Sequence, residues 1–489
     1  MPKEKSIFKN TLYSIALRVF NLVVPIVVGA YPINIFGAGL MGTANYSETI
    51  YLYFMIFAGF GIYNYALREI SRVRNNKKKV EQLFTSFFIL TIITHLIVTA
   101  VYLIYTWTSF KGQFIYGVLL VYGFNMFQDI FYIEWINEAL ENYNFITIKS
   151  IIVRSIYVVL LLTLVKTKDD FMIYVWLNTF CLVANNLTSF IYIKKDFKFD
   201  FSKIEIKKHI KPLLFIMVIA NATVLYTKLD ELFLGWYGAG NYSAVSIYHV
   251  PQLMINIINP VILSIVAVTV PRLSNVIVEK GEEEYEKLLN KITTIYYMFL
   301  FPVGIGLSLY SKEVIALYTT SKYKEYIPAI TVLQIFAIYL LVLGTQSIFT
   351  NQIMYVKKKE NELFKFILVC GVLNFILKGI LIKFGEFNPA TAIGSTLISN
   401  FALIAMQYVF IRTKIKMNYN ILEWSKIKYL IFSLIFIPVT MFIRSFDLGI
   451  IKTAIVGVTI NAAIYMAILY FTRDKPFNLI LSKILRKKK

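Results

Sequence analysis

Four basic residues lie inside long apolar stretches of the chain: Arg18, Arg154, Lys228 and Lys378. A charge at the depth of a bilayer centre costs at least about 2.5–3.5 kcal/mol, so such residues are paired, reach the membrane surface or serve a function. Guanidinium and ammonium groups in that setting are suited to an anionic ligand such as a phosphate. We therefore treat these four, with Asn221 on the helical face of Lys228, as candidate substrate-binding residues.

Acidic residues and one histidine could carry a proton or a cation. Lys228 can reach Glu231 at i+3, with Asp230 beside it, so this cluster either neutralises itself or leaves a carboxylate free to titrate or bind a cation. His249, close to Pro251, could titrate near neutrality, although such a residue is more often a hydrogen-bonded core histidine.

Asp129 belongs to a polar stripe that also includes Asn125, Gln128 and Tyr132 at helical spacing. A polar stripe in lipid must face protein or water. Asp129 and Arg154 lie at similar depths on neighbouring predicted spans, so they either pair with each other or contact a substrate. The stripe therefore predicts a protein-facing or water-facing side on this helix.

Two other basic residues also leave alternatives open. Arg18 lies near the middle of its span, where it either faces a central cavity or forms a structural ion pair. Lys378 is at i+4 from Asn374 and about one turn from the outer end of its span, so its ammonium group could instead reach the membrane surface.

The elements that position these residues are apolar helices. Of the 489 residues, 58% are apolar and 16% are charged, and the mean hydropathy is +0.64, which is typical of a polytopic membrane protein. We predict an all-α integral membrane protein with about fourteen spans, at 10–31, 43–66, 83–107, 113–135, 146–165, 171–193, 212–236, 242–270, 288–310, 327–350, 363–383, 390–411, 428–445 and 449–471.

The net charge of +22 reports orientation in the membrane. With a cytoplasmic N-terminus, the inner segments hold 37 of the 50 Lys and Arg residues, including Lys149, the outer segments hold 9, and 4 lie within spans. Because basic residues collect on the cytoplasmic side, this bias predicts that both termini are cytoplasmic. The basic composition therefore does not indicate a nucleic-acid partner.

Motifs of soluble enzymes and of metal sites do not occur. The two cysteines, Cys181 and Cys370, and the three histidines form no metal-binding spacing, and neither a GxSxG nor a phosphate-binding P-loop motif is present. The basic N-terminus leads into an apolar stretch too long for a signal peptide, which indicates a retained first helix. The outer segments are short, the longest running from Ser311 to Tyr326, which disfavours a membrane glycosyltransferase or polymerase. We expect a non-enzyme without cofactors.

The two halves of the chain repeat each other. Gly37-Ala38-Gly39 and Asn45-Tyr46-Ser47 in the first half correspond to Gly238-Ala239-Gly240 and Asn241-Tyr242-Ser243 in the second. Because six spans separate the copies, the repeats are parallel, as in two-lobed alternating-access transporters. The predicted parts are an N-terminal lobe (1–198), a C-terminal lobe (199–416), and two added helices with a basic cytoplasmic tail (417–489).

Loosely spaced residues carry a family resemblance over roughly residues 8 to 412. They are Lys9, Asn10, Pro25, Gly37, Gly42, Tyr53, Phe54, Gly59, Gly61, Tyr65, Arg68, Glu69 and Ile70, then Asp129 to Glu138, Glu141, Tyr143, Ile146 to Arg154, Asp170 and Tyr174, and finally Tyr226, Asp230 and Gly240-Asn241-Tyr242. This pattern resembles the bacterial polysaccharide transporters, the Wzx-type oligosaccharide flippases of the multidrug/oligosaccharidyl-lipid/polysaccharide (MOP) superfamily.

The resemblance implies a multi-pass protein of the bacterial cytoplasmic membrane that moves a polyprenyl-pyrophosphate-linked oligosaccharide to the outer leaflet. It implies a lipid-linked substrate, contact with membrane lipid, possible proton coupling and possible polymerase or export partners. Arg68 and Glu69 are then candidate gate residues, and Asp129, Asp230, Glu231 and His249 are candidates for coupling or ion pairing. A lipid II flippase and a multidrug or cation antiporter of the same superfamily remain alternatives.

The sequence departs from some members of the superfamily at residues that bear on the coupling ion. Some members of the superfamily bind sodium through carboxylates on helices 7 and 11, whereas the eleventh span here offers Asn374 and Lys378. Because a tethered ammonium group repels sodium, we expect proton coupling, or no obligate coupling ion, rather than sodium.

Overall fold

The computed structural model describes residues 7–238 and 240–486, and gives the backbone alone for 7–27, 215, 218–227, 480 and 483–486. All regular secondary structure in these residues is helical, which confirms the predicted all-α class. The chain divides into two compact units, Met1–Ser246 and Ile247–Lys489, which we describe one at a time.

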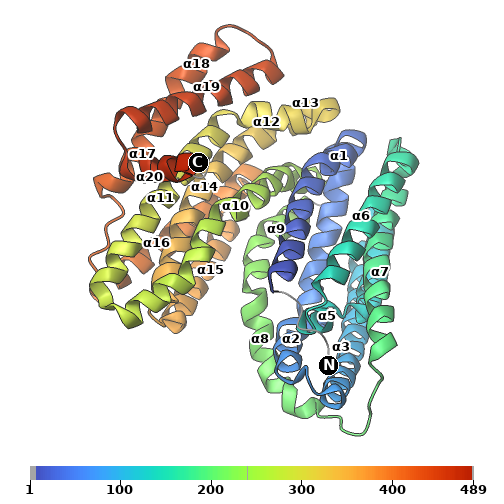
Figure 1. Ribbon diagram of the computed structural model, residues 1–489. Coiled ribbons are helices and arrows are strands. Elements are labelled where there is room, and N and C mark those ends of the chain that lie inside the picture. The colour runs from blue at the N-terminus through green and yellow to red at the C-terminus, as the bar shows by residue number, and fades with distance from the viewer. Residues whose placement is uncertain (1–6, 239, 487–489) are drawn as a thin grey trace. The chain divides into compact units, whose positions relative to one another are not determined.

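The first unit is built from long helices joined by short turns (Figure 1). Its elements are α1 (Ile7–Gly59), α2 (Ile62–Val73), α3 (Lys77–Phe110), α4 (Phe114–Gln128), the 3₁₀ turn η1 (Asp129–Phe131), α5 (Glu134–Ala139), α6 (Tyr143–Leu164), the 3₁₀ turn η2 (Lys168–Asp170), α7 (Phe171–Asp196), α8 (Ile206–Thr227) and α9 (Leu229–Tyr237). Helices α8 and α9 group with this unit. The lobe boundaries predicted from the repeat remain a prediction.

The second unit begins within α10. Its elements are α10 (Ser243–Glu279), α11 (Gly281–Leu309), α12 (Ser311–Tyr318), the 3₁₀ turn η3 (Thr320–Lys322), α13 (Tyr323–Tyr326), α14 (Pro328–Ser347), the π-helical turn η4 (Ile348–Met354), α15 (Glu360–Lys383), α16 (Pro389–Thr413), α17 (Trp424–Leu434), α18 (Phe436–Arg444), α19 (Ile450–Phe471) and α20 (Lys475–Arg486). The predicted outer loop 311–326 thus contains the helices α12 and α13.

In the described part of the chain, twelve helices are long and apolar enough to cross a membrane. The predicted span 10–31 falls largely, and the span 212–236 in part, on residues whose side chains the structure does not describe. The chain is therefore a multi-pass membrane protein, and the count of fourteen spans, like the topology, remains a prediction.

Two helices that lie side by side in the first unit are interrupted. The backbone of α1 leaves the helical region at Gly37, with φ of 72° and ψ of −174°, a conformation that glycine adopts without a steric penalty. The predicted seventh span is interrupted at Lys228, which separates α8 from α9. Helices α1 and α9 pack against each other, so the residues just beyond these breaks come into contact.

Candidate functional site

The break between α8 and α9 places two carboxyl groups in the protein interior. Asp230 and Glu231 lie in the first turn of α9 and are 1% and 0% exposed. The Nζ atom of Lys228 donates to both carboxylate oxygens of Glu231, at 3.0 and 2.9 Å. The hydroxyl of Thr49 on α1 donates to the same carboxylate at 2.6 Å. The predicted contact between Lys228 and Glu231 is therefore present, and Thr49 joins it.

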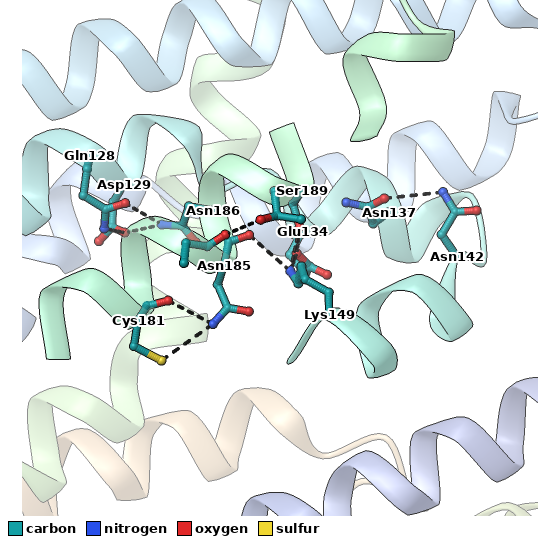
Figure 2. Close-up of polar contacts among 12 residues, drawn as sticks. Gln128, Asp129, Glu134, Asn137, Asn142, Lys149, Cys181, Asn185, Asn186 and Ser189 are labelled. Carbon is teal, nitrogen blue, oxygen red and sulfur yellow. Dashed lines mark hydrogen bonds and ion pairs between the residues drawn. The ribbon is translucent and has the colours of Figure 1, made fainter. Parts of the chain in front are cut away.

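Asp129 lies at the end of α4 in a hydrogen-bonded group that Figure 2 shows in part. Its carboxylate accepts hydrogen bonds from the Tyr51 hydroxyl, from the Gln128 amide at 2.8 Å and from the Asn186 amide of α7 at 2.9 Å. The Asn186 amide also donates to the Gln128 side-chain oxygen at 3.0 Å. All the recorded partners of Asp129 are neutral. Asn125, Gln128 and Asp129 of the polar stripe thus face protein, as predicted, whereas Tyr132 is 43% exposed because the α-helix ends at Gln128.

Asn186 holds this group together, which gives a stability prediction. Replacing Asn186 by Leu removes the donor to both Asp129 and Gln128 and is expected to lower the unfolding free energy by roughly 1–3 kcal/mol, because buried acceptors lose their partner. Thermal unfolding in detergent measures the effect. Asn178 is a matched control on the same helix, since its amide contacts Tyr174 and not Asp129 or Gln128. Equal losses in the two variants would contradict the prediction.

A buried ion pair that the sequence analysis did not single out lies near the start of α6. The ammonium group of Lys149 contacts the Glu134 carboxylate at 2.8 Å and the Ser189 hydroxyl at 2.6 Å, and Ser189 donates to the same carboxylate at 2.6 Å (Figure 2). The side chains of Lys149 and Glu134 are only 5% and 12% exposed. Lys149, counted above with the inner segments, lies inside α6, which starts at Tyr143, and its side chain is enclosed by the helix packing.

Lys378 lies in the interior of the second unit. Its side chain is fully buried, and its ammonium group donates to the Asn374 side-chain oxygen, to Ser395 at 3.1 Å and to Thr396 at 3.2 Å. The alternative that this lysine reaches the membrane surface is therefore wrong, because α15 turns it toward α16. The spacing of Asn374 and Lys378 indicated half of this site, whereas no sequence signal linked it to the pair on α16.

Arg154 does not pair with Asp129. Arg154 lies on α6 and is half-buried, and among the described residues no ion pair or hydrogen bond of its side chain is found. Its candidacy for substrate binding remains a prediction.

The remaining candidate residues from the sequence analysis do not lie together in one cluster of the described residues. Arg18 and Asn221 lie on α1 and α8, outside the residues whose side chains the structure describes. His249 lies half-buried on α10 and interacts with a neighbouring group. On α2, Glu69 accepts hydrogen bonds from Arg68 at 3.2 Å and from Arg72 at 3.1 Å, in a solvent-facing cluster.

The clusters described above do not form a candidate metal site. Among the described residues, no group of three or more His, Cys, Asp or Glu side chains is placed to hold a metal ion. The buried charges instead meet hydroxyls, amides or an opposite charge, which is how charged groups are accommodated in an apolar interior.

A comparison of the sequence with family models shows to which family the chain belongs. Residues 7–277, more than half of the chain, match the model of the family described as polysaccharide biosynthesis protein. The chain belongs to this polysaccharide biosynthesis protein family. The resemblance seen in the sequence is thereby confirmed. Within the family's region lie α1 to α9 and most of α10, together with the Asp129 and Glu231 clusters.

Individual relatives agree with this family. An Escherichia coli (strain K12) protein named "Putative O-antigen transporter" is 21% identical over 384 residues, covering 76% of this chain and 89% of the relative. Among solved structures, the lipid II flippase MurJ in an inward closed conformation matches with a TM-score of 0.65 at 16% identity, covering 95% of this chain and 99% of MurJ.

An inward-facing multidrug resistance MATE family transporter of the MOP superfamily matches with a TM-score of 0.52 at 14% identity, covering 85% of this chain and 96% of that one. This likeness and that to MurJ show that the chain shares the fold of these two proteins. The named relative and both solved structures are transporters or flippases, in agreement with the expectation of a non-enzyme.

Proposed function

We propose that the chain is a flippase of the bacterial cytoplasmic membrane that moves a polyprenyl-pyrophosphate-linked oligosaccharide from the cytoplasmic to the outer leaflet by alternating access. The family match over residues 7–277 carries this proposal, and the name of the Escherichia coli relative supports a glycan as cargo. The free-energy cost of moving polar groups through hydrocarbon agrees with this proposal. An unpaired polar group costs several kcal/mol in hydrocarbon, so a sugar chain needs a polar path through the protein.

The pyrophosphate of such a substrate needs positive partners. Arg154 supports this role because it is half-buried and has no ion-pair partner among the described residues. Lys228 is less available, since it neutralises Glu231. Lys378 is enclosed by Asn374 and its hydroxyl partners, so it would meet a substrate only after α15 and α16 separate. We therefore assign the first contact with the pyrophosphate to Arg154 and Arg18.

Proton coupling has a candidate in Asp129. This carboxyl group is buried among the neutral side chains of Tyr51, Gln128 and Asn186, with no cation among its recorded partners. A carboxyl group in that setting can gain or lose a proton without breaking an ion pair. The clusters around Glu231 and Glu134 are instead neutralised by lysines and suit structural roles.

Deleting the gene tests the proposal. Surface glycan is expected to disappear while lipid-linked oligosaccharide accumulates on the cytoplasmic face, and the wild-type gene should restore export. Complementation by Arg154→Ala or Arg18→Ala should restore protein abundance but leave export reduced, because a folded carrier lacks a pyrophosphate partner. Lys452→Ala is the control, since Lys452 is an exposed residue at the start of α19.

Four outcomes would contradict the proposal or its assigned residues. Unchanged surface glycan in the deletion strain removes its basis. Accumulation of lipid II with intact glycan would point to the peptidoglycan precursor, and sensitivity to cationic drugs alone would point to a multidrug antiporter. Loss of abundance in both arginine variants would assign Arg18 and Arg154 to structural roles.

A further inference from the structure

A pocket of about 450 Å³ lies in the second unit, where α15 begins and α16 ends. Helices α15 and α16 are two candidate membrane spans that pack against each other, so the pocket lies at one boundary of the membrane. Its lining comes from the turn before α15, the first turn of α15 and the end of α16: Lys358, Lys359, Asn361, Glu362, Phe410 and Lys414. A volume of this size is within the range of small-ligand sites.

Three of the six lining residues are lysines without a counterion. Among the described residues, no hydrogen bond or ion pair is found for the ammonium groups of Lys358, Lys359 and Lys414. The one carboxylate of the lining, Glu362, is already paired with Lys365 at 2.8 Å. Like charges around one small pocket repel each other, and an anion placed between them removes that repulsion. The pocket therefore favours a negatively charged ligand.

The charged residues next to the pocket do not compensate these lysines. Lys357 is paired with Glu282, so that carboxylate is already neutralised. Glu360, the first residue of α15, is exposed to solvent and does not line the pocket. The positive charge of the lining is therefore left without a partner from the second unit.

An exposed apolar stripe continues from the pocket along α15. Phe364, Leu368 and Val372 are 41%, 53% and 60% exposed. They follow Asn361 at i+3, i+7 and i+11, so they lie on the same face of the helix as this lining residue. Phe410 adds an apolar side chain to the pocket itself. A lipid can thus place a charged headgroup in the pocket and its acyl chains on the stripe, whereas a free phosphate would use the pocket alone.

We propose that this pocket binds the phosphate of an anionic glycerophospholipid, such as phosphatidylglycerol, with the acyl chains along the stripe of α15. The predicted topology places the pocket at the cytoplasmic leaflet, whose surface is negatively charged, and basic pockets between spans on that side bind lipid headgroups. A zwitterionic lipid matches less well, because its cationic group meets three ammonium groups. The site does not depend on what the protein transports.

Thermal unfolding of the purified full chain in detergent tests which ligand binds. Dioctanoyl phosphatidylglycerol is expected to raise the unfolding temperature with a saturable dependence on concentration. Dioctanoyl phosphatidylcholine has the same chains, and glycerophosphate has the anionic group without chains, so both should have little effect. Equal stabilisation by phosphatidylcholine would refute the role of the lysines. Equal stabilisation by glycerophosphate would show a site for a soluble anion and refute a lipid as the ligand.

Removing the three lysines tests where the lipid binds. The variant Lys358→Gln/Lys359→Gln/Lys414→Gln should bind phosphatidylglycerol about a hundredfold more weakly, because each lysine near a charged membrane surface contributes about a factor of five. Its unfolding temperature without lipid should match that of the wild type, since the three side chains are exposed. If the triple variant does not fold, Lys414→Gln alone should weaken binding about fivefold, and an unchanged Kd would refute the site.

A matched control separates the pocket from general attraction to charge. Replacing Lys77, Lys78 and Lys79 by Gln removes three exposed lysines from the first turn of α3, on the same predicted side of the membrane. This variant should keep the wild-type Kd for phosphatidylglycerol. Equal weakening in the two triple variants would overturn the proposal, because it would show that net surface charge, and not this pocket, holds the lipid.

Discussion

Replacing Lys149 by Met is expected to lower the unfolding free energy by roughly 3–5 kcal/mol, because the Glu134 carboxylate is left buried without its cation. The Ser189 hydroxyl still donates to this carboxylate at 2.6 Å, but one neutral donor does not replace an ammonium group. Met keeps most of the apolar side-chain volume, so the loss reports charge rather than a cavity. Thermal unfolding in detergent and abundance in the membrane both measure it.

Two comparisons make the Lys149 prediction specific. Lys365→Met on α15 breaks an ion pair with Glu362 in which the lysine is 64% exposed, so its cost should stay within about 1 kcal/mol. The double variant Lys149→Met/Glu134→Gln removes both charges and should regain much of the stability. A double variant as unstable as Lys149→Met alone would show that packing, and not the unpaired carboxylate, sets the cost.

Replacing Lys378 by Asp is expected to make the protein respond to sodium, which the wild type should not. The ammonium group of Lys378 fills a space surrounded by the oxygens of Asn374, Ser395 and Thr396. Oxygen ligands of this kind suit a hard cation, and the wild-type protein supplies its own positive charge there. The shorter Asp side chain vacates the space and adds a carboxylate. Sodium at tenfold excess over its Kd would then add about 1.4 kcal/mol of stability.

The measurement for Lys378 is thermal unfolding in sodium and in choline at equal ionic strength. Lys365→Asp makes the same charge change on an exposed face of α15 and should show no preference for sodium. A wild-type protein stabilised by sodium to the same degree as Lys378→Asp would contradict the prediction. Export that stops when sodium is withdrawn from wild-type cells would also contradict the expectation of a sodium-independent cycle.

The elements of the fold were predictable because lipid imposes strong rules on sequence. A helix that crosses a bilayer must be apolar over about 20 residues, and this requirement is visible without any tertiary information. The interruptions were harder to predict. Other glycines and lysines of the chain, such as Gly42 and Lys149, lie inside helices, so the residue type alone does not predict a break at Gly37 or Lys228. Packing against neighbouring helices decides where the backbone departs from helical geometry.

The candidate site was predictable where it depends on one helix. The i+3 spacing brought Lys228 to Glu231, and the i+4 spacing brought Lys378 to Asn374. Partners on other helices were not predictable, because the relative rotation and depth of two helices are not encoded in either one alone. For that reason Asn186 and Ser189 were missed, and the ion pair of Lys149 with Glu134 was not predicted.

By itself the sequence determined the helical membrane class and the family resemblance, since each depends on composition or on spacing along one chain. The tertiary structure decided which charges are compensated. It paired Lys149 with Glu134, enclosed Lys378 and separated Arg154 from Asp129. The physical reason is that the burial of a charge or a ring depends on which helix faces pack together. The rotation and depth of each helix fix that packing to within a few ångströms.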